Sequence, residues 1–131
     1  MDFAVPVTKN DQPVQLQVVF GNAQIGAARI RLSDSSKKVI SEFEYSGSDL
    51  FTLPKLNFDS SSYFDIVIFG TVIGTNPATN QGTVAIRFLQ GKEIIKSQTL
   101  TYELKEQGAT QNFIARGKIF LNQQPKDFNS P

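Results

Sequence analysis

Apolar and polar residues alternate with a period of two along most of the chain. In four segments every second residue belongs to one set: Val14, Leu16, Val18 and Phe20; Ala28, Ile30 and Leu32; Val39, Ser41, Phe43 and Tyr45; Leu100, Tyr102 and Leu104. A β-strand with one buried and one solvated face has this period, because successive side chains point to opposite faces. We therefore expect four strands, each with the named set facing a core.

Further strands are predicted around these four. Residues 3–7 alternate as well, but Pro6 lacks an N–H and is expected on a sheet edge. Phe51 and Leu53 begin a strand that Pro54 interrupts. Val84, Ile86 and Phe88 share one face of another strand, and the last strand runs from about Phe113 to Leu121. Turn-forming clusters rich in Asp, Asn, Ser and Gly separate the strands.

These segments predict an all-β protein with about nine strands and no long helix. The expected architecture is an antiparallel two-sheet β-sandwich, immunoglobulin-like or jelly-roll-like, with a flattened barrel as the alternative. The length of 131 residues fits one domain. We assign residues 1–122 to a single domain and residues 123–131, with two prolines and little apolar content, to a flexible C-terminal tail.

The segment from Tyr63 to Ile73 carries more apolar residues than one core face needs. Phe64, Ile66 and Ile68 are expected to face the core, yet Val67 and Phe69 lie in the opposite phase. Either Gly70 marks a β-bulge that returns Phe69 to the core, or a second chain covers the opposite face. The second alternative makes Val67 and Phe69 candidate partner-binding residues.

The composition limits the chemistry. The chain has no Cys and no His, which excludes thiol nucleophiles, Ser-His-Asp triads and Cys or His metal sites. Glu42 and Glu44 share one face of a strand at roughly 7 Å, a spacing that glycosidases use, but alternating Glu is more typical of a solvated face. We expect no enzyme, no cofactor and no metal site. The formal charge of +1 argues against nucleic acid or an anionic membrane as partner.

Uncharged polar residues are abundant: Asn, Gln, Ser and Thr account for 39 of 131 residues. Such a surface suits sugar binders and subunits of assemblies. The ligand-binding candidates are four polar residues in predicted loops: Asp49, Asn76, Asn80 and Gln81. Asp followed by Ser, as at Asp34 and Asp59, could supply oxygen ligands to calcium but more often forms an Asx-turn.

The middle of the chain resembles carboxypeptidase-regulatory-like or transthyretin-like modules of the immunoglobulin type. Three stretches carry this resemblance: GAARIRL at 26–32, FTLPKL at 51–56, and Tyr63 followed by IVI at 66–68. The chain departs from the pattern in having Asp59 to Ser62 where those modules have a glycine. The resemblance implies a sandwich with a non-catalytic accessory role.

The expected function is therefore a non-enzymatic binding or assembly module that acts through protein–protein contacts, as a homo-oligomer or as a subunit of a larger particle. The alternative is a small-ligand or carbohydrate-binding module that uses the loops around Asp49 and residues 76–81. No run approaches the ~18 apolar residues of a membrane span, and no signal peptide is visible within these residues. The compartment is left open.

Overall fold

The computed structural model describes residues 2–9, 11–21, 24–47, 49–76, 78–79, 81–104, 106 and 108–122. These residues form nine strands and no helix: β1 (Asp2–Val7), β2 (Gln15–Gly21), β3 (Ile25–Asp34), β4 (Val39–Ser46), β5 (Asp49–Thr52), β6 (Tyr63–Ile73), β7 (Gln81–Gln90), β8 (Glu93–Glu103) and β9 (Thr110–Leu121). This part of the chain has no helix long and apolar enough to cross a membrane. The predicted tail at residues 123–131 lies outside the described residues.

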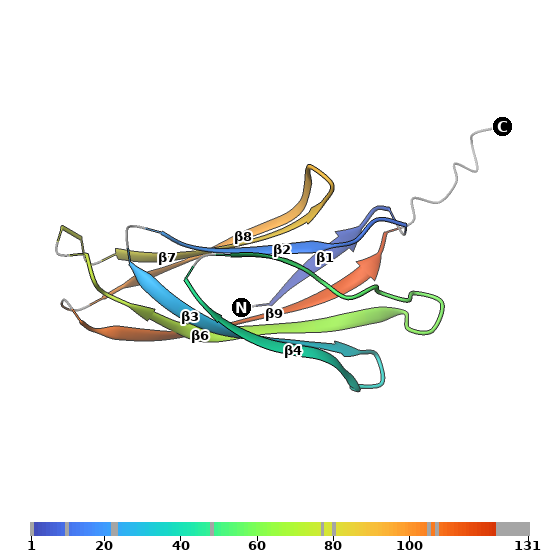
Figure 1. Cartoon of the computed structure of the whole chain (residues 1–131), viewed down its shortest axis with the longest axis horizontal. Helices are drawn as coiled ribbons and strands as arrows, with labels where there is room; N and C mark the ends of the chain where they lie inside the picture. Colours follow the sequence, from blue (N-terminus) through green and yellow to red (C-terminus); the bar gives the residue numbers. More distant parts are fainter. Residues whose placement is uncertain are drawn as a thin grey trace.

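The strands form two sheets that pack face to face (Figure 1). The five-stranded sheet has the order β1-β9-β6-β3-β4, and the four-stranded sheet has the order β5-β2-β7-β8. Neighbouring strands are antiparallel except β1 and β9, which are parallel. Only the β3–β4 and β7–β8 connections stay within a sheet; the others pass between the sheets. The all-β, mostly antiparallel two-sheet sandwich is thus confirmed, and the barrel alternative is not.

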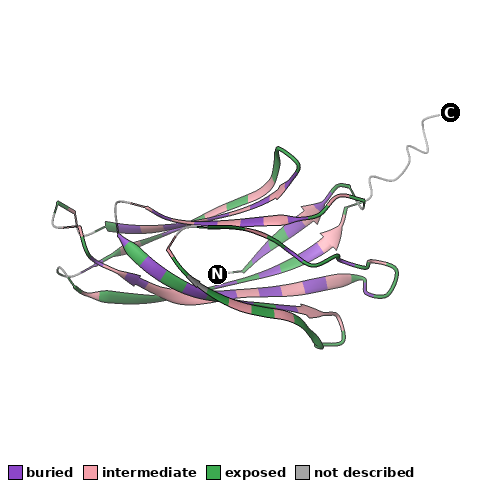
Figure 2. Cartoon of the chain, in the orientation of Figure 1, coloured by how far each residue is buried: buried purple, intermediate pink, exposed green. Residues whose placement is uncertain are grey.

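Buried residues alternate with more exposed ones along most strands, as the banding in Figure 2 shows. The predicted inward sets at residues 14–20, 28–32 and 84–88 are all buried. Phe64, Ile66 and Ile68 of β6 are buried in the same core. The period-two pattern therefore located the core residues of the central strands correctly.

The prediction that Val39 faces the core is wrong. Its side chain is 48 % exposed. The register of the β3–β4 pair shifts between Leu32 and Ser33, so Val39 pairs with Ser33 and its side chain lies on the outer side of the sheet. Further along β4, Phe43 packs against Phe51 of β5 with ring centroids 5.0 Å apart, and this pair closes the gap between the two edge strands. The side chain of Tyr45 lies outside the described residues.

The bulge hypothesis at Gly70 is also wrong. Strand β6 pairs with β3 and with β9 in an unbroken register through Gly70, so the strand phase does not change there. The described sheets have irregular registers elsewhere, between Leu32 and Ser33 and between Phe88 and Leu89. Val67 and Phe69 consequently stay on the face of β6 opposite the core.

Two buried glutamines hold the loops at the two ends of the sandwich. Gln90 is 2 % exposed; its Oε1 accepts hydrogen bonds from the amides of Thr8 and Lys9, and its Nε2 donates to the carbonyls of Lys9 and Gln12. Gln24 anchors the β6–β7 loop in the same way through four backbone groups: the amides of Thr75 and Asn76 and the carbonyls of Thr79 and Gln81. Both glutamines are therefore structural residues.

Candidate protein-binding face

The outward side of the five-stranded sheet, called the outer face below, gathers the predicted partner-binding residues. Its members point away from the core on four adjacent strands: Ile25, Ala27, Arg29 and Arg31 of β3; Glu42, Glu44 and Ser46 of β4; Asp65, Val67, Phe69, Thr71 and Ile73 of β6; Ile114, Arg116 and Lys118 of β9. On β3, β6 and β9 these residues alternate with buried residues of the same strand. The local alternation thus fixes which side chains reach this face.

Cross-strand pairing arranges these side chains in rows. In one row Arg29 and Ile114 flank Phe69, and Glu44 follows beyond Arg29. The next row has Arg31 and Arg116 on either side of Val67, with Glu42 beyond Arg31. Read across the strands, the outer face changes from acidic on β4 to basic on β3 and apolar on β6. Strand β9 follows with Ile114 and two cations.

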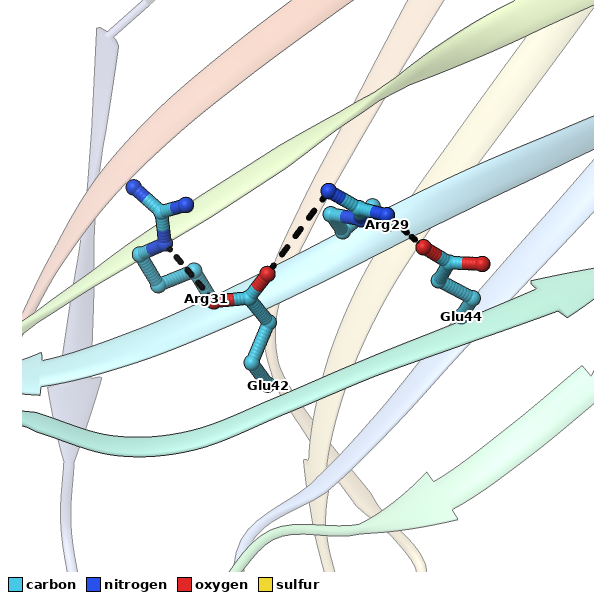
Figure 3. A network of polar contacts seen from close by, with 4 residues as sticks. All are labelled: Arg29, Arg31, Glu42 and Glu44. Carbon is cyan, nitrogen blue, oxygen red and sulfur yellow. Dashed lines mark hydrogen bonds and ion pairs between the residues drawn. The ribbon is translucent and has the colours of Figure 1, made fainter.

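The acidic and basic strands are linked by a ladder of ion pairs (Figure 3). Arg31 Nε donates to Glu42 Oε2 at 3.1 Å, Arg29 Nη1 lies 3.8 Å from Glu42 Oε1, and Arg29 Nη2 pairs with Glu44. These four side chains are 37–62 % exposed, so each pair contributes little stability. The ladder chiefly fixes the positions of the charges. The two carboxylates once considered for catalysis are thus engaged by guanidinium groups.

Phe69 lies at the centre of the outer face and is half-buried by its neighbours. The guanidinium carbon of Arg29 lies 6.0 Å from its ring centroid, at the outer limit for a cation–π contact. Val67 is half-buried as well. The apolar surface that remains open belongs mainly to Ile25 and Ile114, which are 52 % and 42 % exposed.

A hollow of about 500 Å³ lies beside Phe69. Its lining consists mostly of small residues at positions where neighbouring rows carry large ones: Ala27, Ala28, Arg29, Glu44, Ser46, Phe69 and Gly70. The apolar side of Phe69 and the methyl group of Ala27 suit an aliphatic side chain from another molecule. The sequence pattern identified Phe69 but missed Ile25 and Ile114, although the alternation of β9 already places Ile114 opposite the buried Phe113 and Ala115.

The predicted ligand-binding residues lie elsewhere, and the protein already uses several of their polar atoms. Asp49 is exposed at the start of β5, and its Oδ1 accepts a hydrogen bond from the amide of Leu50. Asn76 Oδ1 accepts from the amide of Ala78. Gln81 is exposed, and its carbonyl binds Gln24. Asn80 lies outside the described residues. The role of these residues in ligand binding stays a prediction.

The Asp–Ser clusters form turns. Asp34 Oδ1 accepts from the amides of Ser36 and Lys38, which is an Asx-turn. At Asp59 the turn is made by Asn57, whose Oδ1 accepts from the Asp59 amide. Among the described residues no group of three or more acidic side chains is placed to hold a metal ion.

Two tyrosines are partly covered. Lys118 Nζ lies 4.2 Å from the ring centroid of Tyr63. Tyr102 packs against the core, and this burial raises the pKa of its phenol above the ordinary value of a tyrosine. Neither ring offers an open flat surface for a sugar.

A scan against protein-family models, a search of curated proteins and a search of solved structures each find no match. The resemblance to carboxypeptidase-regulatory-like or transthyretin-like modules therefore stays a prediction.

Proposed function

We propose that this protein is a non-enzymatic assembly module that associates with a second copy of itself through the outer face. The observation that carries the proposal is the pairing, on one face, of a hollow beside Phe69 with the exposed aliphatic side chain of Ile114. The same face can thus supply both a projecting group and a recess for it. An interface between two identical faces needs this self-complementarity.

The order of charges supports a two-fold axis that lies in the interface between the two outer faces. This axis runs parallel to the strands, midway between β3 and β6. Such an axis puts β4 of one copy over β9 of the other, and β3 over β6. Because the rows are shared across the sheet, Glu42 then faces Arg116 of the second copy. In the row of Phe69, Ile114 of the second copy comes over Glu44, beside the hollow. Opposite charges meet, and the exposed isoleucine reaches the recess.

The same axis brings apolar side chains together at one end of the face. Ile25 pairs with Ile73 across the β3–β6 ladder, so the axis stacks Ile25 of each copy on Ile73 of the other. Arg29 of one copy comes over Phe69 of the other, an arrangement that favours a cation–π contact. The arrangement thus joins opposite charges in the row of Val67 and apolar side chains in the row of Ile25.

Three of the four sheet edges, β1, β5 and β8, offer a poor route to association; the fourth edge is β4. Strand β1 carries Pro6, β5 has four residues, and β8 turns Lys96 inward, in the phase of the buried Phe88. A proline, a short strand and an inward charge each hinder the addition of another strand. At these three edges the features favour contact through a face over the addition of a strand.

Replacing Ile25 and Ile114 by serine together should abolish most of the association. Each side chain contributes about 1 kcal/mol of burial, and a symmetric dimer contains two copies of each, so the loss of about 4 kcal/mol should raise the dissociation constant roughly 1,000-fold. The measurement is the molar mass by light scattering over a concentration series. The fold should persist, because both residues are largely exposed in one copy.

The matched control is Leu50→Ser with Ile94→Ser. These side chains are 48 % and 52 % exposed but belong to strands of the four-stranded sheet. The control variant should keep the mass of the wild type. A wild type that remains monomeric at millimolar concentration rejects self-association, and equal effects of the two double variants reject the choice of face.

Charge reversal tests the proposed axis directly. Glu42→Arg alone, or Arg116→Glu alone, places like charges opposite each other at both symmetry-related positions, and each variant should dimerise roughly 10- to 100-fold more weakly than the wild type. A mixture of the two variants should form heterodimers, because each charge then meets its opposite. Native mass spectrometry of a mixture in which one variant is isotopically labelled measures this. Absence of recovery in the mixture contradicts the axis, even if the outer face is the interface.

A further inference from the structure

We propose that the protein has a second, independent site: a pocket at one end of the sandwich that binds a neutral saccharide. This end pocket has a volume of about 780 Å³, within the range of small-molecule sites. It lies between the β1–β2 connection and the β5–β6 connection, and its lining residues are Val7, Asp11, Gln12, Pro13, Val14, Pro54, Lys55, Leu56, Asn57, Phe58 and Asp59. The two connections meet at the end of the sandwich opposite the β6–β7 loop (Figure 1).

Both walls of the end pocket are held in place before any ligand binds. Gln90 fixes the β1–β2 connection through the amides of Thr8 and Lys9 and the carbonyl of Gln12. The β5–β6 connection begins with a hydrogen bond from the Leu53 amide to the Val14 carbonyl at 2.9 Å. Further along it, Asn57 accepts from the amide of Asp59 through its side chain. A pre-formed pocket avoids the entropic cost of ordering its walls.

The floor of the end pocket is apolar and includes an aromatic ring. Val7, Val14 and Leu56 are buried. Phe58 is half-buried and packs edge-on against the buried Phe64, with ring centroids 5.3 Å apart and planes at 84°. A ring held in this way can receive the C–H face of a sugar, which is the apolar surface that a pyranose presents.

The rim is polar and carries both signs of charge. Asp11, Lys55, Asn57 and Asp59 are exposed, and Gln12 is half-exposed. Among the described residues, the carboxylates of Asp11 and Asp59 and the ammonium of Lys55 take part in no hydrogen bond or ion pair, so they are available to a ligand. Carboxylates and amides accept and donate the hydrogen bonds that sugar hydroxyls make.

Other ligand classes fit the end pocket less well. A phosphate or a fatty acid carboxylate would meet two carboxylates and one ammonium, a rim that repels anions on balance. A metal ion lacks a suitable group of acidic ligands among the described residues. A neutral ligand with an apolar face and many hydroxyls matches both the floor and the rim.

The proposal is tested by titrating isotopically labelled full-length protein with probes while recording amide chemical shifts. The probes are glucose, galactose, mannose, N-acetylglucosamine, cellobiose and maltose, with inorganic phosphate and octanoate as the competing classes. We expect at least one sugar to shift the amides of Val14, Leu56 and Phe58 in the millimolar range. No shift from any sugar at tens of millimolar, or shifts at these amides from phosphate or octanoate alone, would overturn the proposal.

Variants at the rim locate the site. Asp11→Ala with Asp59→Ala should weaken sugar binding by about tenfold or more, since two charged acceptors are lost. Glu103→Ala removes an exposed carboxylate at the end of β8, outside the end pocket, and should leave binding unchanged. If the rim variants bind sugar as tightly as the wild type does, the saccharide site lies elsewhere and the end pocket is rejected. Self-association is measured separately, so either proposal can fail without the other.

Discussion

Replacing Gln90 by leucine should lower the free energy of unfolding by about 3–5 kcal/mol, a large part of the stability of a domain of this size. The leucine fills much of the same volume but removes every hydrogen bond that the side chain makes. The amides of Thr8 and Lys9 and the carbonyls of Lys9 and Gln12 lose their partner beneath the β1–β2 connection. Each backbone group left without a partner away from water costs about 1–3 kcal/mol.

Urea unfolding followed by circular dichroism measures this loss. Gln90→Glu distinguishes hydrogen bonding from packing, because it keeps the shape but places a carboxylate oxygen against the carbonyls of Lys9 and Gln12. Gln90→Glu should therefore lower the free energy of unfolding as well. Gln111→Leu, at an exposed position of β9, is the control and should change stability by less than about 0.5 kcal/mol. A urea midpoint for Gln90→Leu equal to that of the wild type would show that the hydrogen bonds of Gln90 contribute nothing to the free energy of unfolding.

The sequence pattern predicted the strands and the core because one physical rule governs both. In β2 and β7 a buried set alternates with a half-exposed set from end to end, so the period of two is enough to assign each side chain to a face. The same rule fails where the register is interrupted. Val39 is in the apolar phase of β4, but the register shift between Leu32 and Ser33 turns its side chain to the outer side of the sheet.

The two buried glutamines could have been found from the sequence by extending the phase of their strands. Gln90 follows Val84, Ile86 and Phe88 at intervals of two, and Gln24 precedes Gly26 and Ala28 in the same way. A polar residue in a core phase needs partners for its amide. What the pattern could not supply is the identity of those partners, because the loops that Gln90 and Gln24 hold are distant in sequence.

The candidate sites could be located only from the order of the strands in the sheets. Val67 and Phe69 stood out because a run of apolar residues exceeded one face, and the outer face confirms only that they point away from the core. The row that joins Glu44, Arg29, Phe69 and Ile114 exists because β4, β3, β6 and β9 are neighbours in space. Periodicity carries no information on which strands are adjacent, so neither the row nor the end pocket could be predicted.

Gly70 shows how a sequence feature can be noticed and given the wrong cause. A glycine inside a strand suggests either a bulge or a close approach of another backbone. The unbroken register excludes the bulge. A Cβ atom at this position would lie 2.0 Å from the carbonyl oxygen of Ala27 and 2.8 Å from Cα of Ala28. The close approach of β3 is thus the reason that the chain has no side chain here.

Replacing Gly70 by valine should accordingly prevent folding or lower the free energy of unfolding by more than about 3 kcal/mol. This loss lies at or beyond the upper end of the cost that is typical when extra carbon atoms are forced into a packed site. Gly70→Ala, with a single added carbon, should still fold and lose about 2–3 kcal/mol. The loss should exceed that of Gly26→Ala and Gly117→Ala, because there the obstacles are the rings of Phe20 and Phe3, side chains that can move, whereas at Gly70 the obstacle is the backbone of the neighbouring strand. Thermal melting and urea unfolding of the three alanine variants rank these losses. A Gly70→Ala variant as stable as the wild type would show that β3 and β6 separate easily. The hollow beside Phe69 would then have no fixed shape and would no longer support self-association.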